Sequence, residues 1–372
     1  MTPDGPMSEA VAGAGADQTL AALLDRCQAF APEYGDGLST HLPMALHALH
    51  SLGAPPARLH ALFDRIAPGL QPRGSARHTA PPMLGQIDDF EAWRARFAAE
   101  LARDGQPALL ARHLPRLMPG VAGVAFHGLI RTAHGLAAGH IGELLSGLAY
   151  WAARYAPLVP AEAGIATASH AATDLIDTIY ANDAISTQTA VMPTSTTRGG
   201  LALPDWLTAL QALRPPGGAP ARLIAGRMQA WAPVPGFAAA ASALRIDADT
   251  LDALARRAAL LYAASGNFTV LHLVTACQAL RQLLPWLGEP APALRQFSIA
   301  AAAALRASGW PGLKMTAPGA PPAAWPDTVA AAVAANDEHV IKLVAACRAH
   351  EAATGDPAYQ AAAARAVQPP TA

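Results

Sequence analysis

Apolar residues recur at helical spacing through most of this chain, and Pro- or Gly-rich breaks separate the periodic stretches. Alanine recurs in runs such as residues 300–304 and 361–364, which favours helix over strand. The pattern therefore predicts a mostly α-helical protein. The expected helices cover residues 18–31, 39–52, 88–103, 107–117, 121–155, 170–181, 204–213, 238–244, 247–265, 267–284, 292–308 and 326–353.

Two of these stretches bear on a possible site. In the second expected helix Ser39 or Thr40 can act as the cap and Pro43 falls in the first turn, so His41 stands at the helix entrance. The stretch 121–155 is expected to break near residues 135–142, where three glycines fall close together.

A loop of Thr, Ser and Gly at residues 188–200 is long enough to act as a lid or to face a substrate.

The chain is long enough, at 372 residues, to bury a large core. It contains no repeat of fixed period, which disfavours a regular solenoid. We therefore predict an all-α fold, a single large helical domain of packed helical hairpins over residues 16–367. Residues 1–15 and 368–372 are expected to be flexible tails, because they lack apolar periodicity.

The charge composition limits the classes of partner. The formal net charge is −1 and only 14% of the residues are charged, without a long basic or acidic block, so we expect no nucleic acid and no membrane as partners. A small molecule is the expected partner, and the oligomeric state stays open. Three distant cysteines and the absence of a secretory signal favour a cytoplasmic protein.

One basic residue departs from the composition. Only two of the 26 basic residues are lysines, Lys314 and Lys342. Lys342 follows His339 by three residues, so a helix places the amine and the imidazole on one face. Unlike a guanidinium, the amine can become neutral when it is buried and can be converted into a carbamate. We take this pair as the best indication of function.

The thirteen histidines are the main reactive side chains of the sequence. Some, such as His127 and His272, stand in apolar helices, where a bare imidazole needs a partner. One such residue is commonly a core histidine bonded to a backbone carbonyl, but several of them with a helix-borne lysine would make a nitrogen-rich metal site. Arg131 and His134 share a helix face with His127 and are candidate catalytic residues. Arg131 could bind a substrate oxygen or pair with Glu143.

Other motifs point elsewhere or are missing. His47 and His50 stand at a ligand-like interval but lie off the His41 face, and we expect them at a solvated edge. The zincin, serine-hydrolase and Glu-x-x-His di-iron motifs are missing. A dinucleotide fingerprint is missing too, so the sequence gives no support for a requirement for NADPH.

Two other classes of function stay open at this level. In a non-catalytic helical binding protein the histidines would satisfy polar groups of the core, and Lys342 would reach solvent or pair with Glu338. A metal-dependent hydrolase could use a carbamylated lysine beside histidines, but it would need two adjacent metal ions and a strand-rich barrel.

Four short motifs, in this order and at wide spacing, give the chain a likeness to a known family. They are residues 40–46, 126–131, 268–275 and 339–342. With them the chain resembles the questin oxidase-like family over nearly its full length. Known members act in fungal aromatic polyketide pathways and oxidatively open anthraquinone-type rings, in chemistry described as Baeyer–Villiger-like or as that of a dioxygenase.

The resemblance implies a mononuclear non-haem Fe(II) centre that is held by four histidines and a carboxylated lysine. Carried over motif by motif, the nitrogen ligands are His41, His127, His272 and His339, and Lys342 bears the carbamate. The expected function is an oxygenase that oxygenates or cleaves an aromatic polyketide with O2, as a mono- or dioxygenase.

Overall fold

A computed structural model describes residues 6–75, 81–159, 200–313 and 324–368, without the side chains of residues 6–14. The helix expected at residues 170–181 lies outside the described residues. So do Lys314 and, except for its last residue, the loop expected at residues 188–200.

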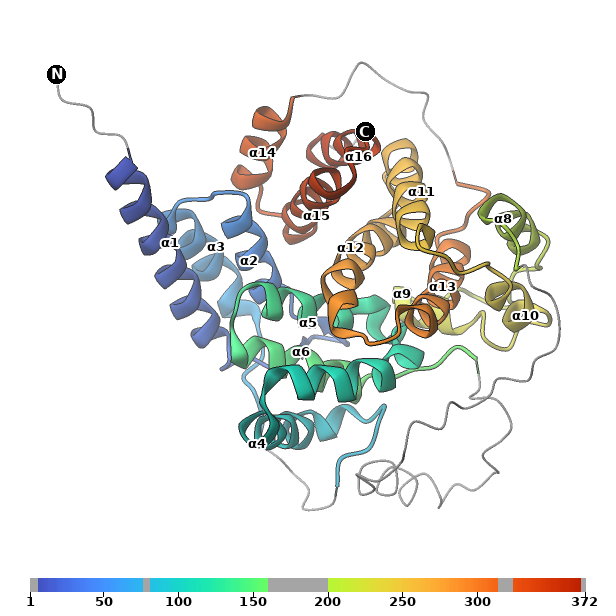
Figure 1. The fold of residues 1–372 in the computed structure, drawn as a ribbon, viewed down its shortest axis with the longest axis horizontal. Coiled ribbons are helices and arrows are strands. Elements are labelled where there is room, and N and C mark those ends of the chain that lie inside the picture. The colour runs from blue at the N-terminus through green and yellow to red at the C-terminus, as the bar shows by residue number, and fades with distance from the viewer. Residues whose placement is uncertain (1–5, 76–80, 160–199, 314–323, 369–372) are drawn as a thin grey trace.

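The described part of the chain is helical, and its strands are one short antiparallel pair (Figure 1). In the first half the elements are α1 (Pro6–Cys27), β1 (Glu33–Tyr34), β2 (Leu38–Ser39), α2 (Leu42–Ser51), α3 (Pro56–Ile66), α4 (Phe90–Leu117), α5 (His127–Ala137) and α6 (Ile141–Ala153). The remaining helices are α8 (Leu203–Gln211), α9 (Ile224–Gln229), α10 (Phe237–Ser242), α11 (Thr250–Ser265), α12 (Phe268–Leu283), α13 (Pro290–Ala307), α14 (Trp325–Ala334), α15 (Glu338–Thr354) and α16 (Ala358–Val367). The prediction of an all-α fold is confirmed, and the described residues hold no strand-rich barrel of the kind that the hydrolase alternative requires. None of the described helices has the length and the apolar character that a membrane crossing demands.

Several expected boundaries were wrong, most of them near the chain ends. α1 begins at Pro6, so it includes most of the stretch assigned to a flexible tail. The single helix expected at residues 326–353 is two helices, because Ala335 is extended and the Asp337 carboxylate accepts the N–H of His339 and starts α15. Arg58 donates to the carbonyl oxygens of Val333 and Ala335 and fixes this junction. α3, α9 and α16 were not predicted.

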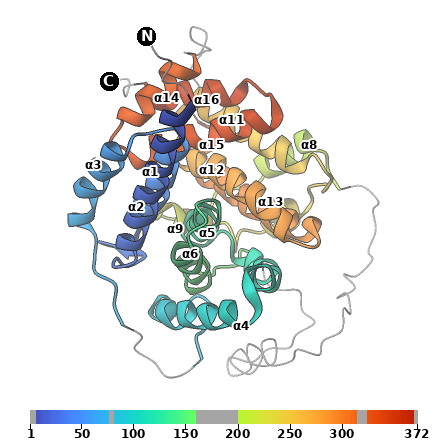
Figure 2. The ribbon, with the colours of Figure 1, turned by 60° about the vertical axis from the view of Figure 1, so that its left-hand side comes forward.

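Four helices near the centre of the molecule contact one another in a closed order. α2 packs on α5, α5 on α12, α12 on α15, and α15 on α2 (Figures 1 and 2). α1 and α3 cover α2 on one side, and α11 and α16 cover α15 and α12 on another. The central helices are therefore largely covered by the outer ones.

Glycines set the close approach of α5 and α6. A Cβ atom added at Gly147 would lie 2.4 Å from the backbone nitrogen of Thr132, and one at Gly135 would lie 2.5 Å from that of Leu144. Gly128 meets the backbone of Trp151 in the same way. Since backbone atoms cannot rotate away as a flexible side chain can, the two helices keep this distance only with glycine at these positions.

We expect Gly147→Ala to lower the free energy of unfolding by about 1–3 kcal/mol, because the added methyl group forces two packed helices apart. Gly288→Ala is the matched control, since nothing lies within 4 Å of a Cβ atom there. Chemical denaturation of both variants measures the difference. Equal stability of the two variants would show that α5 and α6 can adjust their distance without cost.

Candidate metal centre

The four histidines implied by the family resemblance meet in one cluster, which we call the histidine cluster; three of them are buried and His339 is partly exposed. His41 is the N-cap of α2, His127 is the first residue of α5, His272 lies in the second turn of α12, and His339 is the second residue of α15. The ring of His41 is centred 4.7 Å from that of His127 and 4.5 Å from that of His339. His272 lies 5.1 Å from His127 and 5.4 Å from His339. The Nε2 atoms of His41 and His127 are 2.7 Å apart.

The position of His41 confirms the predicted helix entrance but corrects the predicted cap. Neither Ser39 nor Thr40 caps α2. The Thr40 hydroxyl donates to the carbonyl oxygen of Ala31, and the Ser39 hydroxyl bonds the hydroxyl of Tyr150, 2.8 Å away in each case. Both side chains therefore anchor the segment that leads into α2, and the imidazole itself stands at the helix end.

Three of the rings are oriented through Nδ1. The Nδ1 atom of His272 donates to the carbonyl oxygen of Phe268 at 2.8 Å, and that of His127 donates to the carbonyl oxygen of Val124. The Nδ1 atom of His339 lies 3.2 Å from a carboxylate oxygen of Asp337. In each of these three rings the other nitrogen, Nε2, carries the electron pair, which is the arrangement of metal-ligating histidines. The Nε2 atom of His127 accepts a hydrogen bond from the Nε2–H group of His41, so His41 would have to release this proton to bind a metal ion.

A left-handed turn precedes His127. Val124, Ala125 and Phe126 have φ angles of 43°, 53° and 69°, although none of them is glycine. Such backbone costs about 1–2 kcal/mol per residue, and it persists only where the surrounding structure imposes it. Here it brings the Val124 carbonyl back onto the ring of His127. Strained backbone of this kind is typical of functional sites.

The electrostatic environment keeps the rings neutral. Burial, and then the nearby positive charge of Lys342, lowers the pKa of His127 to about 3 and lowers that of His41 well below its usual value. Burial and the neighbouring imidazoles do the same to His272. The N-termini of α2, α5 and α15 also meet here, and their positive dipole ends disfavour a protonated imidazole. A cluster of neutral nitrogen bases results.

Lys342 lies one turn after His339 and is only 3% exposed. Burial lowers its pKa to about 8, although the carboxylates of Glu338 and Asp337 oppose the shift. No described residue forms an ion pair or a hydrogen bond with its amine. The non-catalytic alternative placed Lys342 at the surface or in a pair with Glu338. The structure shows neither position.

A second pair of imidazoles lies beside Lys342. The Nδ1 atoms of His47 and His134 are 2.8 Å apart. Both residues line, together with Lys342 and Thr275, a small cavity of about 90 Å³. The expectation that His47 lies at a solvated edge was wrong, because its half-buried ring packs against that of His134 on α5, with ring centroids 5.0 Å apart. His50, by contrast, pairs with the exposed Asp17 at 2.9 Å.

Arg131 forms a buried pair with Glu143. Its Nε and Nη2 atoms donate to the two carboxylate oxygens at 2.9 and 3.1 Å, and both side chains are at most 3% exposed. Of the two roles open at the level of sequence, the structure shows the pairing. The ion pair joins α5 to α6 and, through a bond from Gln28 to Glu143, to the end of α1.

The four imidazole rings lie close together, but their positions do not form a metal-coordination geometry. Among the described residues no three His, Cys, Asp or Glu side chains are placed so that they could hold a metal ion as they stand. The metal role of the cluster therefore stays a prediction. So does the role of Lys342, because an unmodified amine is no anionic ligand.

Replacing Arg131 with Met, or Glu143 with Gln, is expected to lower the free energy of unfolding by about 3–5 kcal/mol, because either change leaves a buried group without its partner. The double variant Arg131→Met, Glu143→Leu should recover much of this loss. Denaturant unfolding tests the stability, and turnover of the folded double variant tests catalysis. A folded but inactive double variant would give Arg131 a part in catalysis.

Comparison with known proteins agrees with the geometry. The family model described as questin oxidase-like matches residues 38–347, which include all four histidines of the cluster and Lys342. A search of curated proteins finds no match. Because the matched stretch covers most of the chain, the likeness seen in the four short motifs is confirmed. The chain belongs to the questin oxidase-like family.

Proposed function

We propose that this protein is a non-haem iron-dependent oxygenase that uses O2 to oxygenate or cleave an aromatic polyketide of the anthraquinone type. The observation that carries the proposal is the convergence of four neutral imidazoles from four helices, three of them buried and His339 partly exposed, beside a buried lysine. The family name, which denotes an oxidase, supports the same class of reaction.

The donor set fits iron. His41, His127, His272 and His339 would supply imidazole nitrogens, and imidazole is a suitable ligand for iron. The hydrogen bonds at the Nδ1 atoms of three of these rings are the outer contacts that normally orient metal-bound histidines. Small movements of the rings toward a common point would complete the arrangement.

Lys342 would supply the missing anionic ligand after reaction with CO2. Its amine nitrogen, once neutral, forms a bond to the carbon of CO2 and releases a proton, which leaves a carbamate with two oxygens. The lowered pKa, about 8, makes the neutral amine accessible near physiological pH. The helix N-termini that meet at this point would stabilise the new negative charge.

Iron(II) held by imidazole and carboxylate-type ligands with an open position activates O2. The protein side chains would hold the aromatic ring near this position and exclude water from it. Phe268, the first residue of α12, lies edge-on to His272 and His339, with ring centroids 4.8 and 4.6 Å away, and offers a flat apolar surface beside the cluster. His134 and His47 would contact the carbamate side of Lys342 as neutral hydrogen-bonding groups, since burial lowers the pKa of both.

We expect Lys342→Arg and His339→Ala to weaken iron binding at least about a hundredfold, because changes in outer contacts alone cost ten- to a hundredfold. Turnover should fall with the iron. A guanidinium can neither bind the metal nor form a carbamate. Elemental analysis of protein purified without chelator, followed by an anaerobic optical titration with iron(II), measures the loss.

His60→Ala is the matched control for these variants, because His60 is an exposed histidine on α3. It should keep wild-type iron content and activity. If Lys342→Arg also kept wild-type iron content, the lysine would be excluded as a ligand. Iron-free wild-type protein that cannot be loaded would contradict the whole proposal.

A chemical rescue separates a carbamate from a simple amine ligand. Lys342→Ala shortens the side chain next to the 90 Å³ cavity, which leaves room for a small molecule. Acetate or propionate should restore iron binding and part of the turnover, because a carboxylate replaces the carbamate oxygens. Ethylamine should not. Rescue by ethylamine alone would show that the lysine acts as an unmodified amine.

A further inference from the structure

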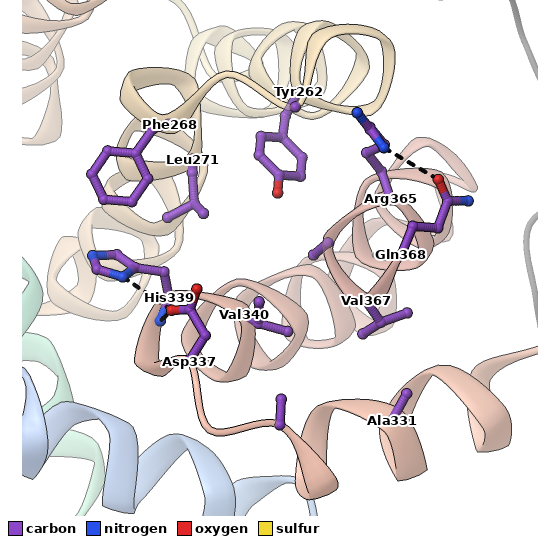
Figure 3. A pocket seen from close by; sticks show the side chains of 13 residues that line it. Tyr262, Phe268, Leu271, Ala331, Asp337, His339, Val340, Arg365, Val367 and Gln368 are labelled. Atoms are coloured by element: carbon purple, nitrogen blue, oxygen red, sulfur yellow. Dashed lines mark hydrogen bonds and ion pairs between the residues drawn. The ribbon is translucent and has the colours of Figure 1, made fainter. Parts of the chain in front are cut away.

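A pocket of about 650 Å³ lies against the histidine cluster, and its two ends differ chemically (Figure 3). His339, Asp337 and Phe268 line one end, and Arg365 and Gln368 line the other. The volume is within the range of about 300–1,000 Å³ that small-molecule sites have. Residues of α11, α12, α14, α15 and α16 form the walls, so the pocket lies between the helix that carries His339 and the C-terminal helix.

The near end offers an aromatic contact next to the cluster. Phe268 is 50% exposed, which is unusual for a phenylalanine in this well-buried part of the fold. Its ring also contacts two of the four histidines edge-on. A flat aromatic molecule in the pocket would cover the exposed phenyl face and bring its own ring close to His339.

The far end offers a guanidinium without a carboxylate partner and a hydroxyl without a hydrogen bond among the described residues. The Nε atom of Arg365 is buried and has no hydrogen-bond partner among the described residues. Its Nη1 atom reaches only the amide oxygen of Gln368, at 3.4 Å, and no described carboxylate lies within ion-pair distance of the guanidinium. The hydroxyl of Tyr262 points into the pocket and bonds no described residue (Figure 3).

Arg365 is held in place at this end. Its guanidinium packs over Gly266, where an added Cβ atom would lie 3.1 Å from Nη2. Gly266 ends α11, so the negative end of that helix dipole faces the cation. The dipole attracts the guanidinium, and Gln368 is the one described residue that accepts a hydrogen bond from it. Arg365 is therefore a cation at the pocket wall whose Nη groups retain N–H donors for a ligand.

We propose that the pocket binds a planar aromatic substrate that bears a carboxylate, with the carboxylate on Arg365 and Tyr262 and the reacting ring beside Phe268 and His339. The parallel N–H groups of a guanidinium match the two oxygens of a carboxylate better than a single phenol oxygen. Tyr262 stays protonated and can donate, because burial raises its pKa to about 12. The inference rests on the proposed function for the identity of the reaction, but not for binding.

The test compares a carboxylate ligand with its uncharged methyl ester. Binding of anthraquinone-2-carboxylate and of its methyl ester to the full-length protein is measured by calorimetry, with and without iron. Wild type should bind the acid about ten- to a hundredfold more tightly, as expected for hydrogen bonds to a charged group. Arg365→Gln should reduce acid binding to the level of the ester and leave ester binding unchanged.

Further variants test the placement of the ligand. Arg348→Gln, at an exposed arginine of α15 outside the pocket, should leave both affinities unchanged. Phe268→Ala should weaken acid and ester alike, because both share the aromatic contact. Circular dichroism and the melting temperature check that each variant is folded.

Equal binding of acid and ester by wild type would overturn the inference, and so would an acid preference that survives in folded Arg365→Gln. These outcomes are distinct from failure of the proposed function. A protein that binds iron and consumes O2 but shows no acid preference contradicts only the carboxylate. An acid preference in a protein that cannot be loaded with iron contradicts only the oxygenase.

Discussion

The core of this protein holds three buried imidazoles, a fourth that is partly exposed and a buried amine without charging them all, and the central helices are arranged around these groups. A charged group buried without a partner costs several kcal/mol, so the rings respond with strongly lowered pKa values. Hydrogen bonds at the Nδ1 atoms satisfy one side of three of the rings. Helix N-termini disfavour protonation of the other side. A neutral imidazole can be buried at low cost, and it also keeps an electron pair that can bind a cation. Neutrality therefore serves both burial and metal binding.

The orientation of the His127 ring requires strained backbone in the turn before it, and packing contacts offset this strain. The left-handed residues before His127 are held by Phe126, which is fully buried and packs on Phe297 with ring centroids 5.8 Å apart. On the other side, a Cβ atom at Gly123 would lie 1.9 Å from the carbonyl oxygen of Arg154. Only glycine permits this approach of the turn to the end of α6. The ring of His127 is thus placed by packing on both sides, which is how a strained segment persists in a folded protein.

The sequence predicted much of this from local signals, and it failed where the signal is tertiary. Proline in the first turn marked the entrance of α2 and hence His41, and the close glycines marked the break between α5 and α6. α14 ends at Ala334 and Asp337 begins α15, but a helical stretch rich in alanine hides such a junction. The alanine-rich sequence also gave no clear boundary for α16, which carries Arg365. Arg365 could not be singled out from sequence, because its role depends on a pocket between helices that are distant in sequence. That Arg131 pairs with Glu143 likewise depends on how closely α5 and α6 approach.

The place of Lys342 follows from helices that start together. α2 and α5 both begin at the histidine cluster and pack on each other, so His47, six residues after His41, and His134, seven after His127, come level about two turns later. α15 begins at the same point and reaches Lys342 after one turn. The lysine therefore stands between the cluster and the second imidazole pair, and its charge acts on rings in both. An arginine there would remain a cation among neutral bases, whereas an amine can lose its proton and react through the adjoining cavity. In a chain that otherwise uses arginine almost throughout, lysine at this position can become neutral, which the proposed carbamate requires and a guanidinium cannot do.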